Sequence, residues 1–279
     1  MKSVLVLIFI MSLKAHAFIP PVSAVLKEIF DDRKFSDDVE FGFLHQVLGG
    51  SGEWSEIEER IVLDRRGPRF LWKVGANGNW ISGQLEKRNY LVGDQKIGAR
   101  SLLFLKSFIA NSAIEFRDVL ISERFLRWDQ LKQFKDGFEL QGEPQTWDIK
   151  TNYLQHNSIY LALLPSGPSI AVMGSQDGNS KRVVYFDKSL KSLKRLEWSE
   201  GSDNFIWNFD SNLTSFKEAF FPKRSYLMKE NREMIQSELI VIRQLNGRKL
   251  KEWMQLWQRS LNSSSAFLDD KLKTLLSYR

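Results

Sequence analysis

The chain has 279 residues and carries 40 Lys and Arg against 34 Asp and Glu, a formal net charge of +6. The excess is mild and both signs are interspersed, so the electrostatic signature of a nucleic-acid-binding protein is missing. The chain contains no cysteine. A disulfide-stapled scaffold and a zinc site built on thiolates are therefore excluded.

The first 17 residues have the three parts of a secretory signal peptide. A lysine comes second, residues 4–13 are almost entirely apolar, and Ala15 and Ala17 are the small residues of a cleavage site. The apolar run is too short to span a bilayer; a retained anchor is the alternative. Cleavage would leave 262 residues with a net charge of +4, beginning at Phe18. Because lipoprotein processing needs a cysteine at that position, we expect an unlipidated periplasmic protein of the Gram-negative envelope.

The first part of the mature chain predicts one helix followed by a meander of strands. Apolar residues at helical spacing after Pro21 predict an amphipathic helix over 21–34. A period of two then begins near Val39, with aromatics on one face, and Asn77-Gly78 is a strong hairpin signal. Trp80 begins the returning strand, and we expect at least five strands in this region.

The middle of the chain changes to helix and then returns to strand. Helical stripes run over 99–111, 113–120 and 122–134, and strand patterns resume from Phe138. Residues 178–198 fit either a surface helix or two strands. We favour two strands joined by residues 189–192, with a short helix over 188–196 as the alternative.

The last part of the sheet is followed by helices. Strand patterns cover 204–210 and 223–229, and the stretch 233–246 is the longest strand candidate. Apolar residues from Leu250 to Trp257 have helical spacing, and Ser265 is the expected cap of a last helix.

The sequence shows no catalytic constellation, and we predict no catalytic residue, cofactor or metal. It has neither a nucleophile-elbow motif nor a phosphate-binding glycine loop. His45 and His156 are the histidines that remain in the mature chain, and neither lies in a motif. The adjacent carboxylates Glu58 and Glu59 are interpreted as solvated residues on opposite faces of a strand.

Several local patterns resemble the LolA/LolB-like carriers of the bacterial envelope. "IPPVSAVLKEIF" (19–30) is similar to the leading helix, "VVYFDKSLKSLKRLEW" (183–198) to a strand pair, and "FFPKRSYLMKENREMIQSELIVIRQL" (220–245) to the closing hairpin. This chain departs from the family in its greater length, a larger helical interlude and a tail over 247–279.

The resemblance implies an α+β fold: a curved antiparallel sheet, an unclosed half-barrel, with helices on its concave side. The expected domains are a signal peptide (1–17), the LolA-like half-barrel (18–246) and a helical C-terminal extension (247–279). The implied function is a non-enzymatic carrier that shelters the acyl chains of a lipid or lipidated protein. Seven residues are the hypothesised cavity lining: Phe41, Phe43, Phe70, Trp72, Trp80, Trp207 and Ile235.

The expected partners follow from the carrier role. They are a lipid or lipoprotein cargo, an inner-membrane donor and an outer-membrane acceptor, with transient membrane contact and a monomeric state. Trp253 and Trp257 lie on a basic helix that suits a membrane-docking or lid helix; a helix packed on the outside of the sheet is the alternative. Two other function classes stay open: an envelope interaction protein with a filled core, and a hydrolase whose site would gather polar groups around His45 or His156.

Overall fold

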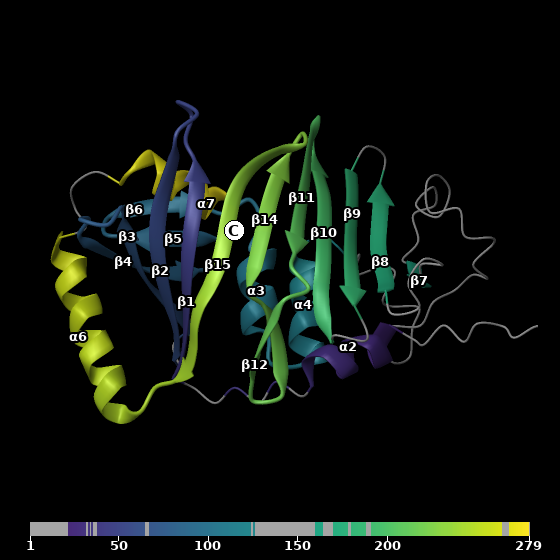
Figure 1. Ribbon diagram of the computed structural model, residues 1–279, viewed down its shortest axis with the longest axis horizontal. Coiled ribbons are helices and arrows are strands. Elements are labelled where there is room, and N and C mark those ends of the chain that lie inside the picture. Colours follow the sequence, from purple (N-terminus) through teal and green to yellow (C-terminus); the bar gives the residue numbers. More distant parts are fainter. Residues whose placement is uncertain are drawn as a thin grey trace, which may run out of the picture.

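One large antiparallel sheet dominates the computed structural model (Figure 1). The part of the chain that the structure describes comprises residues 22–31, 33, 35, 38–64, 67–123, 125, 160–163, 170–177, 180–187, 191–263 and 268–278. The strands predicted at 137–143 and 146–154 lie outside it, as does most of the helix predicted over 122–134.

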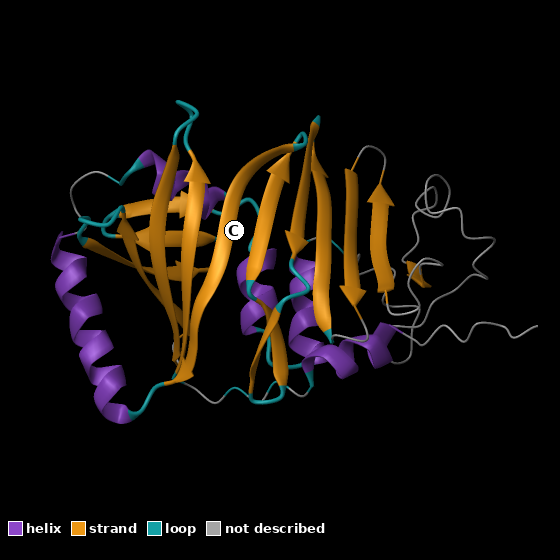
Figure 2. Ribbon diagram, viewed as in Figure 1, coloured by secondary structure: helices purple, strands orange, loops and turns teal. Residues whose placement is uncertain are grey.

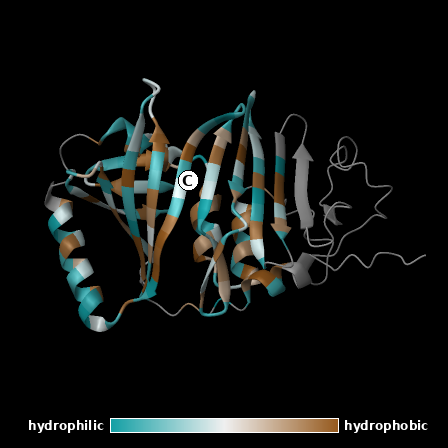
Figure 3. Ribbon diagram, viewed as in Figure 1, coloured by the Kyte–Doolittle hydropathy of each residue, from teal (hydrophilic) through white to brown (hydrophobic). Residues whose placement is uncertain are grey.

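The sheet begins as a meander, as the period of two predicts. Apolar and polar residues alternate along its strands (Figure 3), so one face of each strand turns toward the core. The strands of this half are β1 (Val39–Leu48), β2 (Trp54–Asp64), β3 (Gly67–Val74), β4 (Trp80–Glu86), β5 (Asn89–Val92) and β6 (Gln95–Gly98).

The second half of the sheet confirms that residues 180–200 form two strands rather than a helix. β9 and β10 pair antiparallel, with Leu196 opposite Val184. The strands of this half are β7 (Tyr160–Leu163), β8 (Ile170–Asp177), β9 (Ser180–Asp187), β10 (Ser192–Glu200), β11 (Asp203–Phe209), β14 (Arg224–Lys229) and β15 (Arg232–Gln244). A separate hairpin, β12 (Leu213–Phe216) and β13 (Ala219–Pro222), lies between β11 and β14 in sequence.

The two halves join where the first strand meets the last. The 13-stranded order is β6-β5-β4-β3-β2-β1-β15-β14-β11-β10-β9-β8-β7, and β1 pairs antiparallel with β15. β6 and β7 are therefore the two edges of an open sheet, which bends so that β3–β6 pass behind β1 and β2 (Figure 1). The expected α+β fold with an unclosed antiparallel sheet is confirmed.

Most of the described helices cover one face of the sheet, which we call the inner face: the face that carries Phe43, Trp72 and Trp207. The buried residues of these helices belong to one continuous core with the inner face. The helices are α2 (Val22–Phe30), α3 (Leu103–Ile109), α4 (Ala113–Ser122) and α7 (Asp270–Ser277).

Local capping explains where two of these helices begin. The Ser112 hydroxyl accepts a hydrogen bond from the Glu115 backbone N–H at the start of α4. The Asp269 carboxylate caps α7 by accepting from the Lys271 backbone N–H. The prediction that Ser265 caps the last helix was wrong, because α7 begins five residues further on and has its own acidic cap.

Helix α6 (Gly247–Ser263) lies on the opposite, outer face, apart from the other helices (Figure 2). It packs against β4, and its Trp253 and Trp257 are buried with Val62 and Leu71 in a second, smaller apolar cluster. Among the described helices, none has both the length and the apolar character that crossing a bilayer requires.

Candidate functional site

Six of the seven hypothesised cavity residues lie together on the inner face. Each has an exposed fraction of 1% or less. They come from four strands, β1, β3, β11 and β15. Side chains alternate between the two faces along each strand, so every second residue points inward. The six are Phe41, Phe43, Phe70, Trp72, Trp207 and Ile235.

Trp80 lies apart from these six. Ile81 and Leu85 of β4 pack against the core of the inner face, so Trp80 points outward, where it joins the cluster under α6. The Arg60 guanidinium lies 5.0 Å from its ring centroid. The sequence prediction placed Trp80 with the inward-facing residues. Trp80 is the first residue of its strand, and the sequence alone does not determine which face of the sheet that residue occupies.

Helix α3 covers the six residues with aromatic side chains of its own. The Phe104 ring stacks on Trp207 with centroids 4.3 Å apart and an interplanar angle of 9°. Phe43 lies 5.6 Å from Phe104 and 5.2 Å from Phe108. In the described residues, the space between α3 and this part of the sheet is therefore occupied by protein side chains.

Helix α4 is held against α2 and α3 from the side. Phe116 stacks on Phe30 of α2 with ring centroids 4.1 Å apart. Glu123, at the end of α4, is 2% exposed as a side chain and forms ion pairs with Lys106 at 3.1 Å and Arg88 at 3.2 Å. Helix α4 is thus joined to α2 by ring stacking and to α3 by an ion pair.

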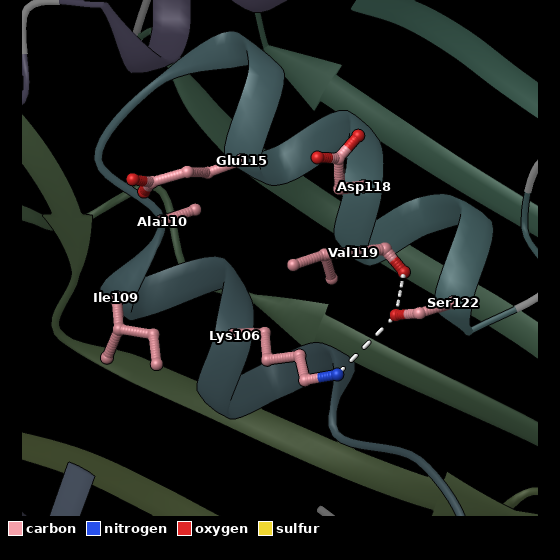
Figure 4. A pocket seen from close by; sticks show the side chains of 7 residues that line it. All are labelled: Lys106, Ile109, Ala110, Glu115, Asp118, Val119 and Ser122. Atoms are coloured by element: carbon pink, nitrogen blue, oxygen red, sulfur yellow. Dashed lines mark hydrogen bonds between the residues drawn. The ribbon is translucent and has the colours of Figure 1, made fainter. Parts of the chain in front are cut away.

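A groove of about 410 Å³ runs between α3 and α4 on the side away from the sheet (Figure 4). Lys106 donates to the Ser122 hydroxyl at 3.4 Å across one end of it. The lining residues are Lys106, Ile109, Ala110, Glu115, Asp118, Val119 and Ser122.

A buried arginine contacts α3 from the segment after α2. The Arg33 side chain donates from Nη1 to the Ser107 carbonyl oxygen at 2.6 Å. Its guanidinium lies 4.3 Å from the Phe30 ring centroid and 4.9 Å from that of Phe221. Burial lowers the pKa of Arg33 to about 9, because the charged form loses its hydration. The guanidinium remains charged at neutral pH.

A polar network crosses the inner face within the apolar core. His45 Nδ1 lies 2.7 Å from the Ser237 hydroxyl oxygen, and His45 Nε2 lies 3.3 Å from the Glu59 carboxylate. The Trp72 indole N–H donates to the same carboxylate at 2.7 Å. His45 and Glu59 have no exposed surface, so the interpretation of Glu59 as a solvated residue was wrong. Glu59 alternates along β2 with Ile57 and Ile61. Because every second residue of a strand points to the same face, these two apolar neighbours indicate that Glu59 points inward.

The two tryptophans predicted on a membrane or lid helix face the protein. Trp253 and Trp257 are 6% and 8% exposed. The Trp257 indole N–H donates to the Gly83 carbonyl at 3.1 Å, and Arg69 lies 4.9 Å from the Trp257 ring centroid. The third alternative, a helix packed on the outside of the sheet, describes α6.

No family model and no curated protein matches the chain. Among solved structures, it is similar to a candidate outer membrane lipoprotein-sorting protein domain from Vibrio parahaemolyticus, with 9% identity, a TM-score of 0.44, and coverage of 84% of this chain and 97% of that one. It is also similar to a DUF1329 family protein from Desulfovibrio piger, with 13% identity, a TM-score of 0.38, and coverage of 81% and 94% respectively.

Proposed function

We propose that this protein is a periplasmic carrier that shelters acyl chains between the inner face and helices α3 and α4, which we call the lid. The observation that carries the proposal is the stack of Phe104 on Trp207. Helix α3 inserts apolar side chains among the aromatic side chains of the strands. If α3 moves away from the sheet, an acyl chain could occupy the same space.

The energies of lid and cargo are comparable. Helix α3 buries four apolar side chains, Leu103, Phe104, Leu105 and Phe108. Exposing them would cost about 6–12 kcal/mol, at about 1.5–3 kcal/mol for each side chain. Burying an acyl chain contributes about 0.8 kcal/mol per methylene, or about 12 kcal/mol for sixteen carbons. Exchange of lid for cargo is then close to balanced, as a carrier that must also release its cargo requires.

The surrounding features fit the same role. The signal-peptide pattern supports export to the periplasm, and the lack of cysteine supports an unlipidated protein. The cargo would be a lipid or lipidated protein, received from an inner-membrane donor and passed to an outer-membrane acceptor. The protein would work as a monomer without catalysis, and its membrane contacts would be transient.

Extraction of the protein after mild purification tests the proposal. Mass spectrometry should recover an acyl lipid, and the emptied protein should take up a fluorescent fatty acid. A Phe43→Asp variant, which places a charge among the aromatics, should lose uptake, whereas Trp54→Asp on an exposed strand end should keep it. Absence of both lipid and uptake in the wild type would contradict the carrier role.

A non-catalytic envelope interaction protein is the second candidate. The observation that favours it is the occupation of the inner face by α3, since a purely structural core would look the same. The uptake experiment separates the two, because a scaffold with a permanent core takes up no fatty acid.

Acyl hydrolysis is a third candidate, favoured by the Ser237–His45–Glu59 arrangement. If His45 carries its proton on Nε2 and that N–H donates a hydrogen bond to Glu59, Nδ1 can accept the Ser237 proton, as a general base does. Ser237 is only 4% exposed, so a substrate could reach it only after the lid moves. Covalent labelling of Ser237 by a fluorophosphonate that carries a long alkyl chain would favour hydrolysis; no labelling by that reagent would count against it.

A further inference from the structure

Arg33 is a buried cation with few partners. It is 3% exposed. Its Nη1 donates to a backbone carbonyl, and its Nε has no hydrogen-bond partner. Within the described part of the chain, no carboxylate forms an ion pair with it. Two phenyl rings, Phe30 and Phe221, contact the guanidinium.

Such an arrangement is costly for folding alone. A desolvated charge is normally balanced by an opposite charge, and an unsatisfied donor adds to the cost. The Ser107 carbonyl and the two rings return only part of the lost hydration. A buried methionine would fill the same volume without these costs, so the guanidinium at this position points to a ligand that supplies the missing negative charge.

The space beside Arg33 adjoins the proposed acyl site. A small cavity of about 10 Å³ lies there. Phe108 and Phe209 line it, and the same two rings lie near Phe43 and Phe104 in the aromatic row. This is about the least space that can hold one water molecule. A larger group can enter only if Ser107 moves away together with α3.

We propose that Arg33 is the receptor for a single anionic group, a carboxylate or a phosphate, at the end of the acyl ligand. The proposal deepens the carrier function and rests on it. The anion would replace the Ser107 carbonyl, because charge-assisted bonds from a guanidinium are stronger than bonds to a neutral oxygen and can be bidentate. Entry of the headgroup therefore removes one of the bonds that hold α3 in place.

The experiment compares ligands with one chain length and different ends: dodecanoate, dodecyl phosphate and the uncharged methyl dodecanoate. Affinities are measured at pH 8 by displacement of a fluorescent probe, for wild type and three variants. Arg33→Met removes the charge, Arg33→Lys keeps it without the planar fork, and Arg248→Met, which removes an ion pair to Glu252 on α6, is the control.

Wild type and the Arg248→Met control should bind the preferred anion at least about tenfold more tightly than the ester. Arg33→Met should bind all three ligands alike, with the ester affinity unchanged, and Arg33→Lys should keep a reduced preference. Preference for dodecanoate or for dodecyl phosphate identifies a fatty acid or a phospholipid-like headgroup as the source of the anion.

Equal binding of anions and ester by wild type would overturn the anion receptor and leave the carrier function standing. A preference that survives in Arg33→Met would overturn it as well. If wild type binds none of the three ligands, the carrier function fails and this inference fails with it. The wild-type comparison decides the case even if Arg33→Met does not fold.

Discussion

Truncation of Phe104 should weaken the protein and strengthen ligand binding at the same time. Phe104 is 1% exposed and lies within 6.1 Å, centroid to centroid, of four other rings: Trp207, Phe108, Phe43 and Phe209. A Phe→Ala change at such a position costs about 3–5 kcal/mol of stability, of which the transfer of one side chain accounts for about 1.5–3 kcal/mol.

In the wild type, an acyl chain must displace the Phe104 ring from Trp207 before it can bind there. Phe104→Ala removes that competition. If half of the transfer energy is recovered on binding, the affinity rises about three- to tenfold, since about 1.4 kcal/mol corresponds to a factor of ten. Urea denaturation measures the stability, and probe displacement measures the affinity.

Leu71→Ala is the control. Leu71 is fully buried, but in the cluster under α6 on the outer face. We expect this variant to lose about 2–5 kcal/mol of stability without a gain in affinity. If Phe104→Ala lowers the stability while the affinity stays constant or falls, the exchange of lid side chain for acyl chain is refuted.

Three further predictions concern buried residues of the sheet and of helix α6. Glu59→Ala should lower the free energy of unfolding by about 3–5 kcal/mol in urea denaturation, because the buried partners of the carboxylate lose their acceptor; a loss below about 0.5 kcal/mol would contradict this. Trp257→Ala should lower the free energy of unfolding by about 3–5 kcal/mol and leave acyl uptake unchanged. Impaired uptake would indicate instead that α6 acts as a lid. Gly83→Ala should destabilise by about 1–3 kcal/mol, since a Cβ there would lie 2.5 Å from Trp72 Cζ3; thermal unfolding unchanged from wild type would refute that close approach.

The sheet could be predicted because its strands carry the signal locally. Inward residues such as Phe41, Phe43, Phe70 and Trp72 recur at every second position, and they are buried in the folded chain. The strand pair at 180–200 also followed from local pattern, because β-branched and aromatic residues follow a turn signal there. The spacing of apolar residues predicted helix α6. It did not predict the face of the sheet on which α6 packs, because both faces carry apolar side chains.

The candidate site could be predicted only in part, since several of its contacts join distant segments. Arg33 meets Ser107 across 74 residues and His45 meets Ser237 across 192. No local period encodes such pairs. Phe104 and Phe108 were visible as an apolar helical stripe, yet their position over Trp207 depends on the path of the whole chain. Glu59 is the exception, because its inward parity was readable from Ile57 and Ile61.

The position of a bound acyl chain tests the central claim most directly. A fatty acid brominated at mid-chain quenches the fluorescence of tryptophans that it touches. Titration of wild type should quench a component that disappears in Trp207→Phe, while Trp80→Phe, on the outer face, should retain it. Binding without quenching, or a quenched component that survives in Trp207→Phe and disappears in Trp80→Phe, would place the chain elsewhere and contradict the account.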